Sequence, residues 1–274
     1  MPELPEVETI RAGLEAKLAG RQFDRVEILD ARLTRPHDPV EVAAELQGER
    51  VAAVERRGKY LVFRFESGRA LLVHLRMTGG FRHANRRVED EDPHRRAVVS
   101  LDDGSDVAYR DVRRFGTWLL LEPNELEPYL VSRVGDELLD RRLFAKTLQP
   151  LLTRRRAPIK AVLLDQRLFA GVGNIYADEA LWWSRLHPLR SAASLDLAEI
   201  KRLLQGVRKA LTHGIARQGA TLRDYRGVEG QSGSMQREFR VYGRAGEPCT
   251  RCGTAIRKTR AGGRGTWFCP ACQP

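Results

Sequence analysis

The sequence predicts an α+β protein with more than one domain, in which a mainly antiparallel β region precedes a helical region and a cysteine-rich hairpin. Three observations lead to this fold class. Hydrophobic residues alternate with a period of two in the first half, recur at helical spacing in the second half, and are followed by a segment that holds all four cysteines. A chain of 274 residues with 42% hydrophobic content can fill more than one core, so two or more domains are expected.

The N-terminal region is expected to begin with an amphipathic helix at residues 5–19, which Gly20 ends. Period-two segments then predict strands, with Ser67-Gly68 and Asp103-Gly104 at hairpin turns. The expected strands are residues 23–29, 60–65, 69–75, 97–101 and 117–121. They favour a two-layer antiparallel β-sandwich, with the polar residues 83–95 as a surface loop.

The pattern becomes helical from about residue 125. The expected helices are residues 125–131, 143–152, 159–164, 175–183 and 197–216. The run 170–174 is too rich in glycine for a helix interior, and residues 226–234 are rich in glycine and serine. These changes divide the chain into domains at residues 1–124, 125–240 and 241–274.

The four cysteines are spaced Cys249-x2-Cys252-x16-Cys269-x2-Cys272, the pattern of a four-thiolate zinc site on a short hairpin. Two disulfides are the alternative, but no secretory signal accompanies the cysteines. We expect one structural Zn²⁺ per chain and no organic cofactor. A four-cysteine site is closed, so the metal is expected to shape the fold and to take no part in the chemistry.

The net charge of +11 lies in the last quarter of the chain. Residues 201–274 hold 15 Lys and Arg against four Asp and Glu, whereas residues 1–200 hold 32 of each. Such a basic segment on a neutral body favours a polyanion partner, most simply nucleic acid, over a solubilising surface. No apolar run is long enough for a membrane span and no signal peptide is visible, so we expect a soluble, intracellular protein.

The N-terminus offers a nucleophile. If Met1 is removed, Pro2 carries a free secondary amine, whose ordinary pKa of roughly 7.7–8.0 leaves a neutral fraction near pH 7. Such an amine can attack an electrophilic carbon and form an iminium, and the carboxylates of Glu3 and Glu6 lie beside it to move protons. The alternative is an ordinary helix start, with Pro5 in the first turn and acids favoured by the helix dipole.

Several motifs in a fixed order make the chain similar, nearly from end to end, to bacterial formamidopyrimidine-DNA glycosylases. They are Pro2-Glu3-Leu4-Pro5-Glu6-Val7-Glu8-Thr9, Arg57-Gly58-Lys59-Tyr60, His74-Leu75-Arg76-Met77-Thr78-Gly79, Arg113-Arg114-Phe115-Gly116, Gly171-Val172-Gly173-Asn174-Ile175-Tyr176 and the cysteine quartet. The resemblance implies a catalytic β-sandwich domain, a helical helix–two-turn–helix DNA-binding domain and a zinc-finger hairpin.

The resemblance also implies a bifunctional glycosylase/AP lyase that removes oxidised purines, 8-oxoguanine and formamidopyrimidines, by β,δ-elimination. Pro2 would attack C1′ of the damaged nucleotide, Glu3 would donate protons, and Lys59 would help β-elimination. Lys59 is otherwise one more base that faces phosphates. Arg264 resembles an arginine that grips phosphates around the lesion and is linked to δ-elimination.

An enzyme of this kind must flip the damaged base out of the duplex and fill the void. Met77, Arg113 and Phe115 match the family's void-filling residues, although residue type alone favours core positions for Met77 and Phe115. Asn174 would bind a phosphate at a helix N-terminus, or simply cap that helix. Further DNA contacts map to His94, Arg114 and Arg156. Residues 221–234 resemble the mobile loop that closes over a flipped purine.

The chain departs from the family pattern at Gly80, Val112 and Arg156, where Lys, Pro and Lys are common. Three alternatives stay open: an endonuclease VIII-like enzyme for oxidised pyrimidines, a non-catalytic lesion-binding DNA module, and a zinc-ribbon interaction protein. The first typically starts Pro-Glu-Gly, whereas this chain has Leu4. The expected partner is double-stranded DNA with oxidised bases or abasic sites, bound by a monomer at the nucleoid in a bacterial cytoplasm.

Overall fold

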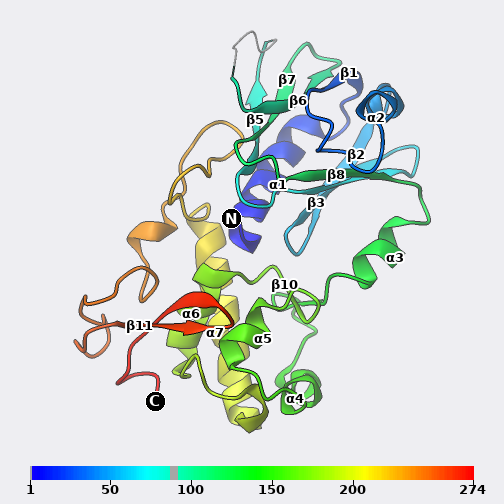
Figure 1. Cartoon of the computed structure of the whole chain (residues 1–274). Coiled ribbons are helices and arrows are strands. Elements are labelled where there is room, and N and C mark those ends of the chain that lie inside the picture. The colour runs from blue at the N-terminus through cyan, green and yellow to red at the C-terminus, as the bar shows by residue number, and fades with distance from the viewer. Residues whose placement is uncertain (1, 87–91) are drawn as a thin grey trace. The chain divides into compact units, whose positions relative to one another are not determined.

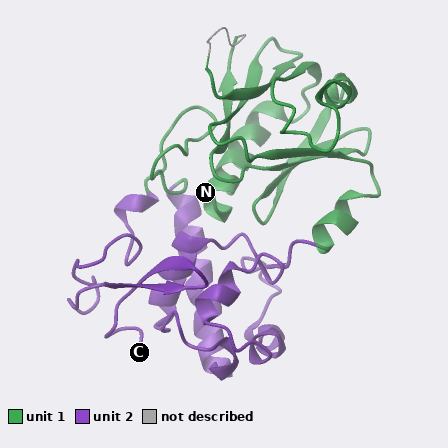
Figure 2. Cartoon of the chain, viewed as in Figure 1, with its two compact units in different colours: residues 1–132, 218–234 green, residues 133–217, 235–274 purple. Residues whose placement is uncertain are grey.

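The computed structural model describes residues 2–86 and 92–274 (Figure 1). The chain forms two compact units, one of Met1–Ser132 with Gln218–Ser234 and the other of Arg133–Arg217 with Met235–Pro274 (Figure 2). We expected residues 218–234 in the helical domain, but they pack with the first unit because Val228 is buried in its core. The expected loop at residues 83–95 is shortened by strands at both ends, and its residues 87–91 lie outside the described part.

The first unit contains two four-stranded antiparallel sheets, which confirms the predicted two-layer β-sandwich. One sheet has the order β1-β6-β7-β5, and its strands are β1 (Phe23–Ile28), β5 (Gly79–Ala84), β6 (Arg95–Leu101) and β7 (Asp106–Asp111). The other has the order β2-β3-β4-β8, and its strands are β2 (Val51–Arg57), β3 (Tyr60–Phe65), β4 (Ala70–His74) and β8 (Thr117–Leu121).

Helix α1 (Leu4–Leu18) buries one apolar face in the core that both sheets share. Its residues Val7, Ile10 and Leu14 are fully buried, as the helical spacing predicted. Helix α2 (Pro39–Leu46) was not predicted, although Asp38 caps it by accepting the N–H groups of two residues in its first turn. A short helix, α3 (Leu126–Val131), ends the first continuous segment of this unit.

The second unit is mainly helical, as predicted. Its helices are α4 (Ala145–Thr153), α5 (Ile159–Leu164), α6 (Asn174–Ser184) and α7 (Leu197–Ala216), with 3₁₀ turns at Ala192–Ser194 and Met235–Arg237. A two-residue parallel pairing joins β9 (Asp136–Glu137) to β10 (Phe169–Ala170), and the zinc hairpin consists of β11 (Arg257–Ala261) and β12 (Arg264–Phe268). Helices α6 and α7 pack closely at Gly206, which has no Cβ. A Cβ at this position would lie only 2.6 Å from the carbonyl oxygen of Ala180 in α6. Within residues 2–86 and 92–274, no helix has both the length and the apolar character that a membrane crossing requires.

Candidate nucleic-acid interface and active site

The candidate nucleophile lies at the start of helix α1. Pro2 is buried and Glu3, the N-cap residue, is 3% exposed. The backbone N–H of Glu3 donates to Glu6 Oε2 over 2.9 Å, which fixes the turn that leads from Pro2 into the helix. The positive end of the helix dipole favours negative charge at this place, so it suits a carboxylate beside Pro2.

Glu6 joins this helix start to the segment Gln218–Ser234 of the same unit. Its Oε1 accepts the N–H of Ala220 over 2.7 Å, so each carboxylate oxygen receives a backbone donor. The neighbouring Gly219 has φ +76°, and a Cβ there would lie 2.7 Å from Glu6 Oε1. Glu6 is 2% exposed, and the structure therefore gives it a positional role beside the predicted catalytic one.

Lys59 lies in the two-residue turn between β2 and β3, where Gly58 supplies the left-handed conformation with φ +58°. Its side chain is almost completely buried, at 5% exposure. Arg56 ties this turn to α1, because its Nε lies 2.8 Å from Glu8 Oε2 and its Nη1 donates to the carbonyl oxygen of Gly58 over 3.2 Å. Pro2, Glu3 and Lys59 thus lie on connected elements of one unit.

His74 lies beside Lys59, since it is paired with Tyr60 across β3 and β4, with ring centroids 4.6 Å apart. Burial, and then the charges of Arg76 and Lys59, lower the pKa of His74 from 6.5 to about 3. Its Nδ1 accepts the N–H of Arg76 over 2.9 Å, which requires an unprotonated nitrogen. His74 is therefore neutral in the folded protein at the pH of a cell.

We expect this burial to make the protein acid-sensitive. The unfolded chain takes a proton at His74 below pH 6.5 and the folded chain does so only near pH 3, so stability falls as pH falls through this window. Between pH 7 and pH 5 this one group should lower the free energy of unfolding by about 2 kcal/mol. Urea unfolding of wild type and His74→Asn at pH 7 and pH 5 measures this change in the free energy of unfolding. An equal pH dependence in the two proteins would contradict the assignment.

Met77 and Phe115 are exposed by 37% and 52%, so the alternative that they are core residues is wrong. The guanidinium of Arg113 lies 4.8 Å from the ring centroid of Phe115. Large apolar side chains that stay in solvent, with a cation stacked on one of them, suit insertion between DNA bases.

Arg114 makes a bidentate pair with Asp30, from Nε to Oδ2 over 2.5 Å and from Nη2 to Oδ1 over 2.9 Å. The hydrogen bond from Arg114 lowers the pKa of Asp30, a carboxyl that is 5% exposed. The carbonyl oxygen of His94 accepts the N–H of Asp111, and its imidazole is half-buried. The pair with Asp30 also anchors the loop that carries Arg114. The DNA contacts of Arg114 and His94 stay predictions.

Asn174 is the first residue of α6 and follows Gly173, which occupies the N-cap position. Its side-chain oxygen Oδ1 is buried and accepts no hydrogen bond from the described residues, so it caps no backbone N–H and the simple capping alternative is wrong. Its Nδ2 donates over 3.2 Å to the carbonyl oxygen of Gly265, next to the exposed Arg264 at the start of β12. The structure thus brings Asn174 and Arg264 together, whereas Arg156 is exposed between α4 and α5.

Sequence reasoning missed a buried lysine that holds the hairpin at this place. Lys160 on α5 is 0% exposed, and its Nζ lies 2.8 Å from each of Asp178 Oδ1, the carbonyl oxygen of Gly265 and Thr266 Oγ1. The other oxygen of Asp178 accepts the N–H of Trp267 over 3.1 Å. The sequence did contain a signal for this buried residue. Lys160 interrupts the apolar helical segment 159–164 in a chain that has only seven lysines.

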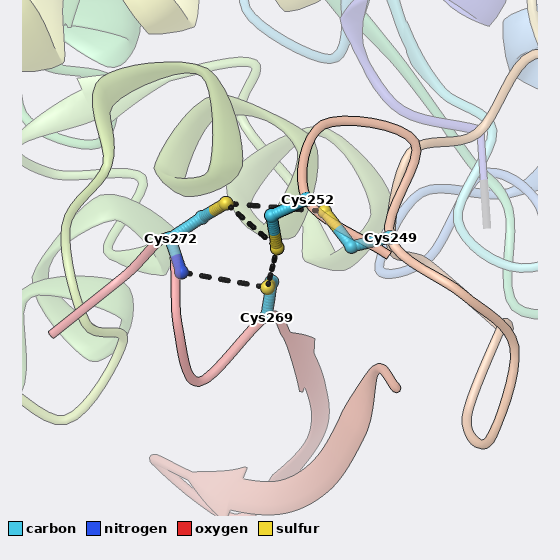
Figure 3. Close-up of side chains that lie close together, drawn as sticks. All are labelled: Cys249, Cys252, Cys269 and Cys272. Atoms are coloured by element: carbon cyan, nitrogen blue, oxygen red, sulfur yellow. Dashed lines mark hydrogen bonds between the residues drawn. The ribbon is translucent and has the colours of Figure 1, made fainter. Parts of the chain in front are cut away.

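The four cysteines converge at the end of the second unit (Figure 3). Their sulfur atoms all lie within 4.8 Å of one another, and the cysteines are free thiols, so the disulfide alternative is wrong. A tetrahedral site with Zn–S bonds of about 2.3 Å needs sulfur atoms ~3.8 Å apart. The distances of 3.5 Å from Cys252 to Cys269 and 4.0 Å from Cys249 to Cys272 fit this geometry. Trp182 Nε1 donates to Cys249 Sγ over 3.4 Å and connects α6 to the site.

Comparison with known proteins agrees with this arrangement. Residues 1–118 match the formamidopyrimidine-DNA glycosylase N-terminal domain, residues 134–226 match the H2TH domain of the same enzymes, and residues 246–274 match the zinc finger found in FPG and IleRS. The formamidopyrimidine-DNA glycosylase of Symbiobacterium thermophilum is 46% identical over 100% of this chain and 90% of its own. The chain belongs to the formamidopyrimidine-DNA glycosylase family. Another member, from Herpetosiphon aurantiacus, is 42% identical over the whole of both chains.

Solved structures of this glycosylase family are similar over 99% of both chains. A Lactococcus lactis Fpg in complex with DNA that contains an abasic site has a TM-score of 0.91 at 35% identity. MutM in complex with DNA that contains carbocyclic 8-oxo-G has a TM-score of 0.91 at 37% identity. The predicted resemblance and the α+β fold with an H2TH region and a zinc finger are therefore confirmed, and the four cysteines form a zinc-finger site suited to one structural Zn²⁺.

Proposed function

We propose that this protein is a base excision repair enzyme, a bifunctional DNA glycosylase and AP lyase that removes oxidised purines from duplex DNA. Its substrates are 8-oxoguanine and formamidopyrimidines, and it also acts on abasic sites. The observation that carries the proposal is the arrangement of Pro2 and Glu3 at the start of α1, with the buried Lys59 on a turn that Arg56 ties to that helix. Family membership supports the same conclusion.

The proposed reaction begins with the neutral amine of Pro2. Its lone pair attacks C1′, and the bond from C1′ to the base breaks with the electron pair leaving on the base, which takes a proton from Glu3. The Pro2 nitrogen then gives its N–H proton back to the Glu3 carboxylate. Glu3 protonates O4′ as the sugar ring opens, and the nitrogen lone pair forms the iminium with C1′. The iminium acidifies the C2′ hydrogen, so its removal, helped by Lys59, expels the 3′ phosphate. A second elimination, which we link to Arg264, expels the 5′ phosphate.

The DNA-binding residues are proposed in two groups. Met77, Arg113 and Phe115 fill the void left by the flipped base. The phosphate contacts are assigned to His94, Arg114, Arg156, Asn174 and Arg264. The proposed functional divisions are a catalytic part at residues 1–124, a helical part at 125–240 and a zinc-finger part at 241–274, except that residues 125–132 and 218–234 belong with the catalytic part because they pack in the first unit. The enzyme would act as a monomer on chromosomal DNA at the bacterial nucleoid.

Borohydride trapping tests the proposed function. The protein is mixed with a duplex that carries 8-oxoguanine opposite cytosine and, in parallel, with one that carries an oxidised pyrimidine. A reduced covalent adduct at Pro2, stronger on the purine lesion, is the expected result. Stronger trapping on the pyrimidine would assign the chain to endonuclease VIII-like chemistry, and binding without any adduct would leave a non-catalytic DNA module.

A substitution at Glu3 separates the two activities. Glu3→Gln keeps the size of the side chain but cannot donate a carboxylic proton, so base excision should fall by about 10²–10⁴-fold. Strand cleavage at a preformed abasic site, where no base has to leave, should fall much less. Single-turnover assays on both substrates measure the difference, and an equal loss on both would contradict the proposed role.

A further inference from the structure

The two loops with the exposed side chains Met77 and Phe115 share one anchoring place in the first unit. One loop runs from the end of β4 to the start of β5, and the other runs from the end of β7 to the start of β8. Each loop therefore passes from one sheet to the other. His74 at the end of β4 is opposite Thr117 at the start of β8, and Gly79 at the start of β5 is opposite Asp111 at the end of β7. Both loops therefore join the same two pairs of adjacent strands, β4 with β8 in one sheet and β5 with β7 in the other.

The carboxylate of Asp111 joins these loops. Asp111 is 1% exposed, and its Oδ1 accepts the hydroxyl of Thr78 over 2.5 Å and the N–H of Arg113 over 3.2 Å. Its Oδ2 accepts the N–H of Gly116 over 2.7 Å. The N–H of Arg113 is shared with Thr78 Oγ1, at 2.9 Å. Thr78 is the neighbour of Met77, and Gly116 is the neighbour of Phe115. One buried carboxylate thus holds the Arg113–Phe115 loop by its backbone and the Met77 loop by the hydroxyl of Thr78.

Close packing leaves these loops little freedom to adopt a different arrangement. A Cβ at Gly79 would lie 2.3 Å from the hydroxyl oxygen of Tyr109, and a Cβ at Gly116 would lie 1.8 Å from the same atom. Each loop also contains a non-glycine residue in the left-handed region, Arg76 with φ +52° and Arg114 with φ +59°. Such conformations persist only where surrounding contacts impose them.

We infer that Asp111 is a positioning residue for base flipping, because its buried carboxylate fixes the Met77 loop and the Arg113–Phe115 loop as one preformed wedge. The inference rests on the proposed function. A wedge must replace stacking as soon as the base leaves, and side chains that are already placed lose little freedom on insertion. Asp111 itself touches neither the damaged base nor the sugar in this scheme, and acts through the two loops.

The test compares Asp111→Asn with Thr78→Val. Asn replaces one acceptor with a donor that faces the existing N–H and O–H donors, whereas Val removes only the bridging hydroxyl. Flipping is followed by the fluorescence of 2-aminopurine placed next to 8-oxoguanine in a duplex, together with single-turnover excision. The second substrate is a single-stranded oligonucleotide with an abasic site, which has no orphaned base and needs no wedge. Borohydride trapping measures the reaction on it.

Asp111→Asn should slow flipping and duplex excision by about 10–100-fold, the scale of a misplaced group in an active site. Trapping on the single strand should change by less than about twofold. Thr78→Val should give a smaller loss of the same kind, and the double variant should be no slower than Asp111→Asn because both disturb one network. Asp106→Asn, a buried acid at the other end of β7, is the matched control and should leave flipping unchanged.

Equal losses on duplex and single strand would show that Asp111 only stabilises the fold, and unchanged flipping in both loop variants would also overturn the inference. If Asp111→Asn fails to fold, as far-UV circular dichroism would show, Thr78→Val decides alone. Failure of the proposed function is distinguishable, because wild-type protein would then give no adduct on the single strand or, as an enzyme for oxidised pyrimidines, no excision from the 8-oxoguanine duplex.

Discussion

Blocking the amine of Pro2 is expected to abolish base excision and leave DNA binding intact. An extra residue ahead of Pro2 turns the secondary amine into an amide, which has no basic lone pair for attack on C1′. The loss should be roughly 10³-fold or more, the scale seen when a covalent nucleophile is removed. Pro2→Gly keeps an N-terminal amine and should lose less. Single-turnover excision and fluorescence anisotropy with the same duplex measure chemistry and binding separately.

Intact mass is the control for this prediction, because the state of the N-terminus must be known for each preparation. The wild-type chain that begins at Pro2 should excise, and any fraction that retains Met1 should not. Full excision by protein whose mass shows a retained Met1 would eliminate Pro2 as the nucleophile. Undiminished activity in a chain with two added residues would do the same.

Removal of zinc is expected to abolish specific DNA binding while the β-sandwich stays folded. Structural zinc contributes about 10–16 kcal/mol of apparent binding free energy near pH 7, more than the stability of a typical domain. The hairpin is also connected to α6, in addition to its contacts with Lys160 of α5. In α6, Glu179 accepts the N–H groups of residues 240–242. Asn174 and Asp178 hydrogen-bond to the backbone of the hairpin, and Trp182 donates to the sulfur of Cys249.

Loss of zinc should therefore reach the N-terminal turn of α6, where Asn174 and Arg264 are proposed to bind phosphates. Hydrogen exchange after chelation should show lost protection in residues 240–274 and in α6, with the strands of the first unit still protected. Affinity should fall at least about 100-fold and return when zinc is restored. Unchanged affinity in protein with no measurable zinc would contradict the proposed grip of the hairpin on DNA.

Periodicity and spacing predicted those parts of the structure that local sequence determines. Helices α1, α5 and α7 and strands β3 and β8 follow from hydrophobic repeats, and the zinc site follows from two Cys-x-x-Cys pairs. Strand β7 was missed because burial on both faces removes the alternation on which the prediction depends. Strand β5 was missed because it begins with two glycines and carries polar residues.

The contacts that organise the candidate site could not be predicted in the same way. Glu6 meets Ala220, Lys160 meets Thr266, and Asp111 meets Thr78, and these partners lie far apart in the sequence. No repeat or spacing rule relates such residues, because tertiary packing alone brings them together. The motif match identified residues near the expected chemistry, whereas the buried groups that hold those residues became visible only in the folded chain.

Because residues 218–234 pack in the first unit, this unit cannot complete its folding early in synthesis on the ribosome. When residues 1–132 have emerged, the core still lacks Val228, and Glu6 lacks the N–H of Ala220. About 100 further residues must be translated, which takes roughly 5–20 s at bacterial rates of synthesis. The nascent N-terminal part is therefore expected to be an incomplete intermediate during this interval. Its helix start cannot take up its final arrangement until most of the chain has left the ribosome, so an unfinished polypeptide would carry the nucleophile but should not cut DNA.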